Sequence, residues 1–427
     1  MRVVIAGAGI GGLTTALALH AVGIEADVFE QSHEVRELGV GFTVLPHGVK
    51  ELAELGLLPA LDKAGIRTRE LIYTNRYGQT VWQEPRGTDA GYDVPQFGIH
   101  RGKLLGVLYQ AVCKRLGGDR IHADSRLVGF AQCGDQVAAY FRCRQGGQHT
   151  EVAGDVLIGA DGIHSTVRSI LYPDEGPPIW SGHILWRGAT DWPVYRDGRT
   201  MIIAGGNAAK LVFSPIYLDA AKPQSRLTNW AVMAHVGEAG SPPLRREDWN
   251  RSGLLEEVLP FVRDRFRLGF VDPVELIETT GPFFEYPNCD RNPLPLWSFG
   301  RVTLLGDAAH PMYPVGSNGA GQAILDACSL ARHLASNASA VEALAVYDAE
   351  RRPLTTEIVL SNRKGGPEGV IDMVEERAPN GFDDIEKVAS YEERKAIVRG
   401  YASLAGYARE QVNRRQPDEP KAADGGS

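Results

Sequence analysis

The sequence predicts an α/β protein in which an inserted antiparallel sheet interrupts a helix-covered parallel sheet, with helices at the C-terminal end. The first thirty residues have the pattern strand, glycine-rich turn, helix, strand, which begins a parallel sheet covered by helices. After about Tyr172, short segments rich in Trp, Ile, Val and Phe alternate with Gly, Pro and Asp, as is typical of antiparallel strands. A buried strand and a long helix return at 301–334, which makes the antiparallel section an insertion.

Composition limits the class of protein. The chain has 427 residues, 43% hydrophobic and 23% charged, which is typical of a soluble globular protein. Its net charge of −8 does not favour a nucleic-acid binder or a polybasic membrane-surface protein, since both need excess positive charge. Five scattered cysteines without a C-x-x-C pair predict no disulfide framework and no metal site, and favour a cytoplasmic setting.

The N-terminal elements follow from local patterns. Residues 3–24 carry no charge, but their clustered glycines do not fit a membrane helix, so we predict a buried strand at 2–6 and a helix at 13–22. A second strand is predicted at 26–30. Further predicted strands lie at 71–75, 80–83, 137–143 and 155–158, and a helix lies at 101–116.

The later elements are assigned in the same way. The antiparallel strands are predicted at 183–190, 200–204, 210–216 and 229–235, and a helix follows at 248–262. A buried strand at 301–305 leads through a glycine-rich turn into a helix at 321–334. Apolar residues at helical spacing predict one or two amphipathic helices between 382 and 412.

The glycine-rich turn carries the first functional signal. Gly7-Ala8-Gly9-Ile10-Gly11-Gly12 matches G-x-G-x-x-G between a strand and a helix. In this pattern Gly7 permits a tight turn, Gly9 lets a pyrophosphate approach the backbone, and Gly12 allows close packing of helix and strand. The helix N-terminus attracts the phosphate. Glu30, at the end of the second strand, is placed to accept hydrogen bonds from ribose hydroxyls. The sequence therefore predicts dinucleotide binding.

Two distant segments distinguish FAD from NAD. Asp161-Gly162 follows one apolar strand, and Gly306-Asp307 follows another. A carboxylate at a strand end can hold a ribityl hydroxyl, and an adjacent glycine lets the chain pass close to the cofactor. Together with the glycine motif, and in this order, the segments resemble the group A flavoprotein monooxygenases, which have the para-hydroxybenzoate hydroxylase fold.

The resemblance implies a fold and a set of cofactor residues. The fold is an FAD-binding Rossmann-like (GR2-type) domain with an inserted antiparallel-sheet substrate domain and C-terminal helices. Asp307 corresponds to the family's ribityl-binding aspartate, Asp161 to its Asp-Gly residue linked to FAD and the nicotinamide cofactor, and Arg101 to an arginine that reaches the flavin. By the same resemblance, cofactor contacts are expected at Gly41, at Leu127 near the adenine, and at Gly319 and Ala320 beside the flavin ring.

Domain boundaries follow from this fold. The FAD-binding domain is predicted at 1–172, with a small β excursion at 67–98, and it resumes at 286–364. The antiparallel-sheet substrate domain occupies 173–285, and C-terminal helices occupy 365–412. The tail at 413–427 has no large apolar residue and is expected to be disordered.

The resemblance also implies an activity. NADH or NADPH reduces FAD, and a flavin C4a-hydroperoxide formed with O2 hydroxylates an aromatic ring, with or without decarboxylation. Within the family, stretches at 51–61, 81–91, 248–261 and 286–326 most resemble the phenazine-hydroxylating members. A phenazine-like or other aromatic carboxylate or phenol is therefore the expected substrate. A single phosphate-binding motif implies that the nicotinamide cofactor visits only transiently, and the chain is expected to be a monomer or homodimer.

Substrate contacts are less determined by the sequence. The antiparallel sheet is expected to cover the substrate, with lining residues Trp186, Phe213, Met233 and Pro314, although strand alternation leaves the face open. No acid–base residue is assigned, and His47, Tyr217 and His235 stay as candidates for a base. Alternatives are a monooxygenase of polyketide or tetracycline-type substrates, a non-oxygenating flavin reductase, and a non-catalytic flavin sensor. A flavin halogenase is disfavoured because W-x-W-x-I-P is absent.

Overall fold

A five-stranded parallel sheet forms the centre of the first part of the chain. The computed structural model describes residues 1–34, 40–143, 147, 149–243 and 251–414. The sheet has the order β18-β12-β1-β2-β8, and all of its neighbours are parallel. Its strands are β1 (Arg2–Ala6), β2 (Glu25–Phe29), β8 (Ile121–His122), β12 (Val156–Gly159) and β18 (Val302–Leu304). The chain therefore leaves this sheet after β12 and returns to it at β18, as predicted.

The glycine-rich turn joins β1 to helix α1 (Ile10–Ala21), and two of its glycines leave no room for a side chain. Gly7 has φ +109°, and a Cβ there would lie 2.4 Å from the carbonyl oxygen of Ala160. A Cβ on Gly12 would lie 1.9 Å from the carbonyl oxygen of Gly7. Larger residues would push the strand, turn and helix apart. The uncharged N-terminal stretch is thus a strand, a turn and a helix, and among the described residues no helix is both long and apolar enough to cross a membrane.

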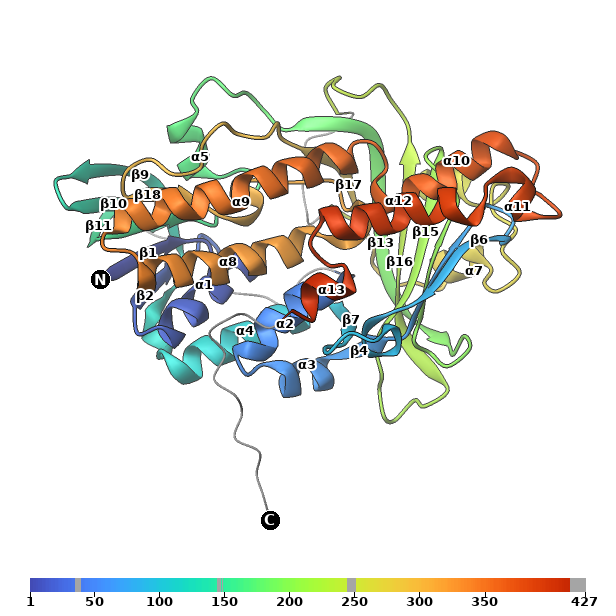
Figure 1. Ribbon diagram of the computed structural model, residues 1–427, viewed down its shortest axis with the longest axis horizontal. Helices are drawn as coiled ribbons and strands as arrows, with labels where there is room; N and C mark the ends of the chain where they lie inside the picture. Colours follow the sequence, from blue (N-terminus) through green and yellow to red (C-terminus); the bar gives the residue numbers. More distant parts are fainter. Residues whose placement is uncertain (35–39, 144–146, 148, 244–250, 415–427) are drawn as a thin grey trace, which may run out of the picture.

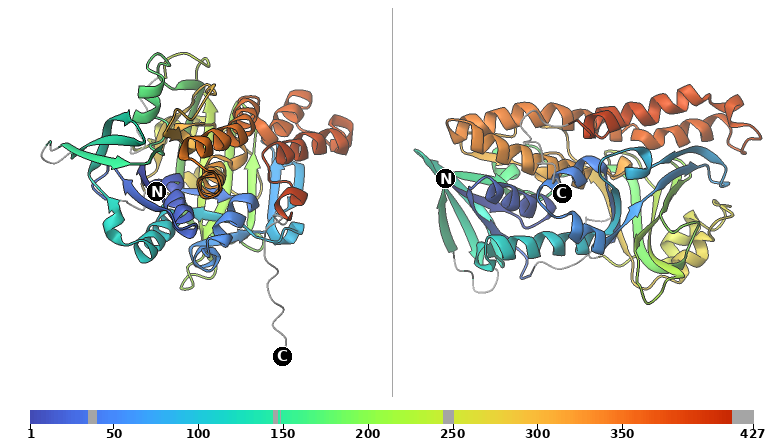
Figure 2. Two further views of the ribbon diagram at one scale, coloured as in Figure 1. Left: turned by 60° about the vertical axis from the view of Figure 1, so that its left-hand side comes forward. Right: turned by 60° about the horizontal axis from the view of Figure 1, so that its bottom comes forward.

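Helices cover the parallel sheet in two layers. Helix α1 packs against α8 (Gly319–Ser336) and α4 (Arg101–Arg115), and α9 (Ala340–Asn362) packs on α8. The right-hand view of Figure 2 shows α9 and the C-terminal helices as one layer that extends across both larger sheets. Smaller elements flank this core. They are α2 (Pro46–Glu54), α3 (Leu58–Ala64), α5 (Thr166–Leu171), the β3-β7-β4 sheet (Gly41–Val44, Gln96–His100, Gly65–Thr68), and the β11-β10-β9 sheet (His149–Gly154, Gln136–Cys143, Ser125–Cys133).

A seven-stranded sheet lies beside the parallel sheet (Figure 1). Its order is β17-β13-β16-β15-β14-β5-β6, with the strands β17 (Phe284–Asp290), β13 (Ile179–Pro193), β16 (Ser225–His235), β15 (Ala209–Tyr217), β14 (Thr200–Ala204), β5 (Glu70–Thr74) and β6 (Thr80–Pro85). All four antiparallel strands predicted between 183 and 235 are confirmed. The sequence did not indicate that β5 pairs in parallel with β14, so that the excursion at 67–98 adds two strands to this sheet.

The two faces of the seven-stranded sheet pack against different helices. One face, with Trp186 and Trp230, packs on α6 (Leu255–Val258) and α7 (Pro273–Glu278). The other face, with Leu71 and Met201, packs near its β14-β5-β6 end on α10 (Gly369–Arg377) and α12 (Tyr391–Leu404). The remaining C-terminal helices are α11 (Ile385–Val388) and α13 (Arg409–Val412).

The helix predicted at 248–262 is shorter than expected. Residues 248–250 lie outside the described residues, and Ser252 forms a β-bridge with Phe284. Helix α6 begins only at Leu255, and a 3-10 turn (Leu259–Phe261) follows it at Pro260. Proline lacks an N–H group and clashes with the preceding turn, which explains the short helix. The predicted tail at 413–427 lies outside the described residues from 415 onward.

A buried polar network joins β18, α8 and α9. Asp326 of α8 has no solvent exposure, and its carboxylate accepts hydrogen bonds from the Gly306 N–H group (3.1 Å), His310 Nε2 (2.5 Å) and Arg351 Nε (2.8 Å). Burial opposes ionisation of Asp326, but the charges and hydrogen bonds of His310 and Arg351 lower its pKa below the ordinary range. Asp326 therefore fixes the turn after β18 to the helix layer.

Replacing Asp326 by alanine is expected to destabilise the protein strongly. The substitution leaves Arg351 buried without its carboxylate, and breaking such a pair costs about 3 kcal/mol or more. Urea unfolding of the purified protein measures the change. Glu392→Ala is the control, because Glu392 pairs with Lys395 at the surface and such pairs contribute about 1 kcal/mol at most. Similar unfolding midpoints for the two variants would contradict the proposed role of the network.

Candidate active site

Four strand ends converge at one edge of the parallel sheet. Gly7 follows β1, Glu30 follows β2, Asp161 comes two residues after β12, and Asp307 comes three residues after β18. Because all these strands are parallel, their carboxyl ends lie on the same edge, where α/β sheets bind ligands. The structure therefore brings together residues that are up to 300 positions apart in the sequence.

Glu30 binds the glycine-rich turn directly. Its Oε2 accepts a hydrogen bond from the Ala8 N–H group (2.9 Å), and its Oε1 accepts one from the Ser32 N–H group (2.8 Å). Each carboxylate oxygen keeps a second lone pair, which is available to a ribose hydroxyl. Glu30 thus stabilises the turn and still presents an acceptor at the sheet edge.

Asp161 caps helix α5. Its carboxylate accepts hydrogen bonds from the Thr166 N–H group (2.6 Å) and from the Ser165 hydroxyl. Burial raises the pKa of Asp161, and these hydrogen bonds oppose that rise. The backbone at Asp161 lies beside Gly7, where a Cβ would be 3.1 Å from the Cα of Asp161. The side chain therefore shapes the turn, while the backbone faces the glycine loop.

Asp307 lies next to the start of α8. Its side chain is accessible to solvent, yet protein surrounds it, and this enclosure raises its pKa against the positive charges of His310 and Arg101. Gly319 is adjacent, since a Cβ there would lie 4.0 Å from Asp307 Oδ1. A buried Arg168 holds the turn from below by donating to the carbonyl oxygens of Ala308 (3.1 Å) and Ala309 (2.9 Å).

This edge fits a dinucleotide such as FAD. Gly7 and Gly12 pack against backbone, whereas a Cβ on Gly9 would meet no atom within 4 Å, so the turn leaves open space at Gly9. Glu30 and Asp307 offer acceptors, and the 18-residue helix α8 begins beside Asp307. Two of the predicted contact residues lie in packed parts of the fold. Leu127 is buried in β9, opposite Phe141, and Gly41 is closely packed against Ile216 and Asn229. Among the described residues, no cluster of side chains is suited to a metal ion.

The loop before α8 is held by the C-terminal helices. Gly316 has φ +69°, and a Cβ there would lie 2.7 Å from the ring of Tyr401 in α12. The Gly316 N–H group donates to Glu368 Oε1 (3.1 Å), and Glu368 Oε2 accepts from the buried Lys210 Nζ of β15 (2.6 Å). Asn318 Nδ2 donates to the hydroxyl of Tyr401 (3.0 Å). The loop is therefore tied to the seven-stranded sheet and to the C-terminal helices.

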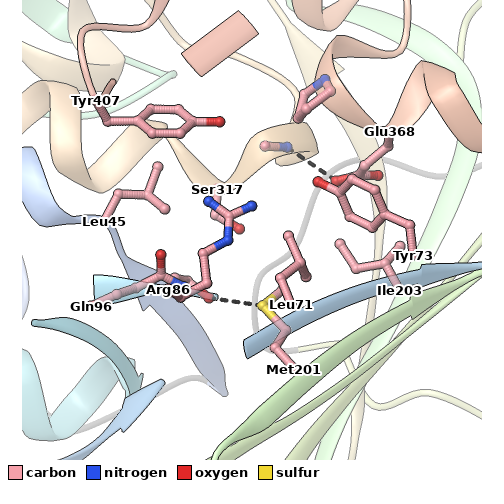
Figure 3. Close-up of a pocket in the computed structure, with 13 residues that line it drawn as sticks. Leu45, Leu71, Tyr73, Arg86, Gln96, Met201, Ile203, Ser317, Glu368 and Tyr407 are labelled. Atoms are coloured by element: carbon pink, nitrogen blue, oxygen red, sulfur yellow. Dashed lines mark hydrogen bonds between the residues drawn. The ribbon is translucent and has the colours of Figure 1, made fainter. Parts of the chain in front are cut away.

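A pocket opens between this loop and the sheet (Figure 3). Its walls come from the β3 strand and its end, from β5 and β14, from the Gly316–Ser317 loop, and from the C-terminal segment. Most of the lining side chains are apolar or aromatic. The lining residues are Thr43, Leu45, Leu71, Tyr73, Arg86, Gln96, Met201, Ile203, Gly316, Ser317, Pro367, Glu368 and Tyr407. The cavity has a volume of about 20 Å³, which is room for a water molecule, so a larger ligand fits only after the lining side chains move.

The predicted lining residues are only partly on the pocket side. The prediction is wrong for Trp186 and Phe213, which lie in the core on the opposite face, together with α6 and α7. Met233 lies on the face of Leu185 and Tyr286, which the strand register makes the pocket face, but it is not among the lining residues. Pro314 is exposed at the start of the loop. Alternate residues of a strand lie on opposite faces of the sheet, and the pairing register determines which of them lie on the pocket face.

The candidates for a base do not line the pocket, although the His47 ring lies 5.8 Å from that of Tyr407, which does. His47 is buried beneath the start of α8, where a Cβ on Gly321 would touch its ring. Tyr217 lies under the ammonium group of Lys103, and His235 is exposed at the end of β16. None of the three is among the described residues that line the pocket.

The sequence did not reveal the polar residues of the pocket. Arg86, Gln96, Glu368 and Tyr407 come from segments that carry no motif. The only signal was that Arg86 lies within the stretch 81–91 that supported the resemblance to phenazine-hydroxylating enzymes. Charged residues are usually exposed, so nothing in the sequence predicted that Arg86 is buried. Its burial is seen only in the structure.

His47 is expected to make the protein sensitive to acid. Burial, together with the positive charge of Arg351, lowers the pKa of His47 from 6.5 to about 3. Below pH 6.5 the unfolded chain binds a proton that the folded chain does not, so stability falls as pH falls towards 3. Between pH 7.5 and 5, His47→Gln should lose about 2 kcal/mol less stability than the unmodified protein. Urea unfolding at both pH values measures this, with His20→Gln at the exposed end of α1 as control; equal losses would contradict it.

A protein-family comparison matches both halves of the parallel-sheet region. The family described as "FAD binding domain" matches residues 1–177 and 290–361. These segments contain β1, β12 and β18, and therefore the strand ends at which Gly7, Asp161 and Asp307 meet.

Individual relatives extend the match to most of the chain. The chain is 44% identical over 405 residues to phenazine 1,6-dicarboxylic acid hydroxylase PhzS of Lysobacter antibioticus, covering 94% of this chain and 96% of that protein. It is 30% identical over 373 residues to 3-hydroxybenzoate 6-hydroxylase 1 of Aquipseudomonas alcaligenes, covering 85% and 88%.

A solved structure shows the same fold. Klebsiella pneumoniae HpxO, complexed with FAD and uric acid, aligns with a TM-score of 0.73 at 23% identity, covering 95% of this chain and 96% of that one. From the family match and the relatives together, the chain belongs to the FAD-binding-domain family and is an FAD-dependent hydroxylase of the group A flavoprotein monooxygenases.

Proposed function

We propose that this enzyme hydroxylates a flat aromatic acid of the phenazine class, using FAD, O2 and NADH or NADPH. The observation that carries the proposal is the 44% identity to a phenazine 1,6-dicarboxylic acid hydroxylase across 94% of the chain. The pocket beside the Gly316–Ser317 loop supports it, because the aromatic side chains of Tyr73 and Tyr407 and the apolar side chain of Leu71 in its walls suit contact with a planar ring system.

The residues at the sheet edge would hold the cofactor. In this proposal the glycine turn from Gly7 to Gly12 and the α1 N-terminus bind the pyrophosphate, Glu30 binds the ribose, and Asp307 with Arg101 binds the ribityl side of FAD. The N–H groups of Gly319 and Ala320 at the start of α8 would lie on the side of the flavin ring. Bound FAD would supply hydride acceptance from the nicotinamide cofactor and activation of O2.

The remaining residues would position the substrate and exclude water. Met201 and Ile203 of β14 and Leu45 after β3 are almost fully buried around the pocket. A dry pocket protects reactive oxygen species from water and directs them to the ring. The Lys210–Glu368 pair fixes the loop at Gly316, and thereby sets the distance between the cofactor edge and the pocket.

Product analysis tests the proposed function. The FAD-loaded enzyme is mixed aerobically with NADH or NADPH and with phenazine carboxylates, hydroxybenzoates or salicylates, and products are analysed by mass spectrometry. Phenazine carboxylates are expected to stimulate cofactor oxidation most and to gain the mass of one oxygen atom, with or without loss of CO2. Oxidation of NAD(P)H that yields only hydrogen peroxide with every aromatic acid would indicate a flavin reductase instead.

Asp307→Ala is expected to weaken FAD binding about 10- to 100-fold, because it removes hydrogen bonds to a charged group. The purified variant should lose its yellow colour, and FAD titration measures the affinity. Asp135→Ala is the matched control, because Asp135 is fully exposed and pairs with Arg301 at the surface. Full FAD content in the Asp307 variant would show that this residue does not bind the cofactor.

A further inference from the structure

Two buried polar groups in the pocket lack hydrogen-bond partners. Arg86 is only 7% exposed and Gln96 only 1% exposed. Within the described part of the chain, neither Arg86 Nε nor Gln96 Oε1 has a hydrogen-bond partner, and both residues line the pocket. Figure 3 shows the Arg86 side chain extending into the space between Leu45 and Leu71. A buried N–H donor and a buried acceptor left unpaired are unfavourable, and a ligand that pairs both is therefore favoured.

The chain is folded so that these two groups lie together. Arg86 follows the end of β6, and Gln96 begins β7. Between them, Gly87 has φ +54°, and a Cβ there would lie 2.6 Å from the Gln96 nitrogen. Only glycine permits this close approach of the two segments. The turn therefore brings the two backbone segments together, and a donor and an acceptor from them reach the same pocket wall.

Glu84 fixes the orientation of Arg86. Glu84 Oε1 lies 2.7 Å from Arg86 Nη2 and occupies that edge of the guanidinium group. Burial opposes the charge on Arg86, but Glu84 and the neighbouring Tyr407 and Tyr73 raise its pKa, so the side chain stays cationic. The Nε edge is then left for a ligand. A guanidinium with one edge fixed by the protein is well suited to bind a carboxylate at another.

We propose that Arg86 and Gln96 form the site that recognises the acidic group of the substrate, with Arg86 Nε donating to a ring carboxylate and Gln96 Oε1 accepting from an O–H or N–H group of the same molecule. This inference rests on the proposed function and adds the residues that determine specificity.

The proposal is tested with a matched ligand pair, phenazine-1-carboxylate and phenazine-1-carboxamide, which differ in charge but hardly in size. Dissociation constants come from changes in the flavin absorbance of the FAD-loaded enzyme without NAD(P)H, and kcat/KM comes from product formation. The unmodified enzyme should prefer the carboxylate roughly 30-fold. Arg86→Gln should reduce this preference to about 3-fold or less by weakening binding of the carboxylate, with little change for the carboxamide.

The Gln96 half of the site is tested separately. Gln96→Met keeps the size of the side chain but removes the acceptor. It should weaken binding of a hydroxyphenazine carboxylate about 10-fold and that of the unsubstituted phenazine-1-carboxylate about 2-fold or less. Equal losses for the two ligands would overturn the assignment of Gln96.

Two further variants control for folding and for surface charge. Arg86→Gln leaves Glu84 without its cation, so the double variant Glu84→Gln/Arg86→Met, which removes both charges, serves if the single variant does not fold. It should lose the carboxylate preference in the same way. Arg67→Gln removes an exposed arginine that pairs with Asp62, and it should keep the full preference.

The outcomes separate this inference from the proposed function. Retention of the carboxylate preference in both Arg86 variants would overturn the inference while the hydroxylase function stands. Equal binding of carboxylate and carboxamide by the unmodified enzyme would overturn it too. If the unmodified enzyme neither binds nor hydroxylates any phenazine, the proposed function fails, and the inference fails with it.

Discussion

The site depends on one constraint, which is that the carboxyl ends of parallel strands share one edge of a sheet. Four residues that are far apart in the sequence each come just after the end of a parallel strand. They are Gly7, Glu30, Asp161 and Asp307. The turns after these strands must then be held in place. Asp326 does this for the β18 turn through Gly306 and His310, and Asp161 does it for the β12 turn by capping α5. The polar side chains that hold these turns in place are therefore close in the sequence or the structure to the residues of the cofactor edge.

The pocket combines segments inside the family match with segments outside it. The family match ends at residue 361, whereas Pro367, Glu368 and Tyr407 line the pocket from beyond it. Glu368 links the Gly316 backbone to Lys210 in the seven-stranded sheet, and Tyr401 packs on Gly316. The C-terminal helices thus complete the pocket and also fix the loop between the pocket and α8. A change in these helices can alter the substrate while leaving the strand ends intact.

Sequence and structure agree best where local chemistry forces the conformation. The G-x-G-x-x-G turn, the alternation of the antiparallel strands and the apolar run of β18 each depend on a few adjacent residues, and all of these elements form as predicted. Agreement is weakest where two distant segments meet. The parallel pairing of β5 with β14 links residues 130 positions apart, and no local pattern encodes it. The prediction that Trp186 and Phe213 line the pocket was wrong because both faces of their strands are apolar. Alternation within a strand does not show which of two apolar faces meets the pocket.

The sequence alone predicted the fold class and the strand ends at the cofactor edge, because backbone sterics and strand-end carboxylates are local requirements. It predicted the FAD-dependent chemistry through the resemblance of these motifs to the group A flavoprotein monooxygenases. Only the tertiary structure decided which sheet face meets the pocket, that His47 is buried and electrically neutral, and that Arg86 lies inside with an unpaired Nε. Burial and pairing depend on what packs against a residue. For Arg86 the neighbours are Glu84, Gln96 and a tyrosine more than 300 residues later, and this arrangement exists only once the chain has folded.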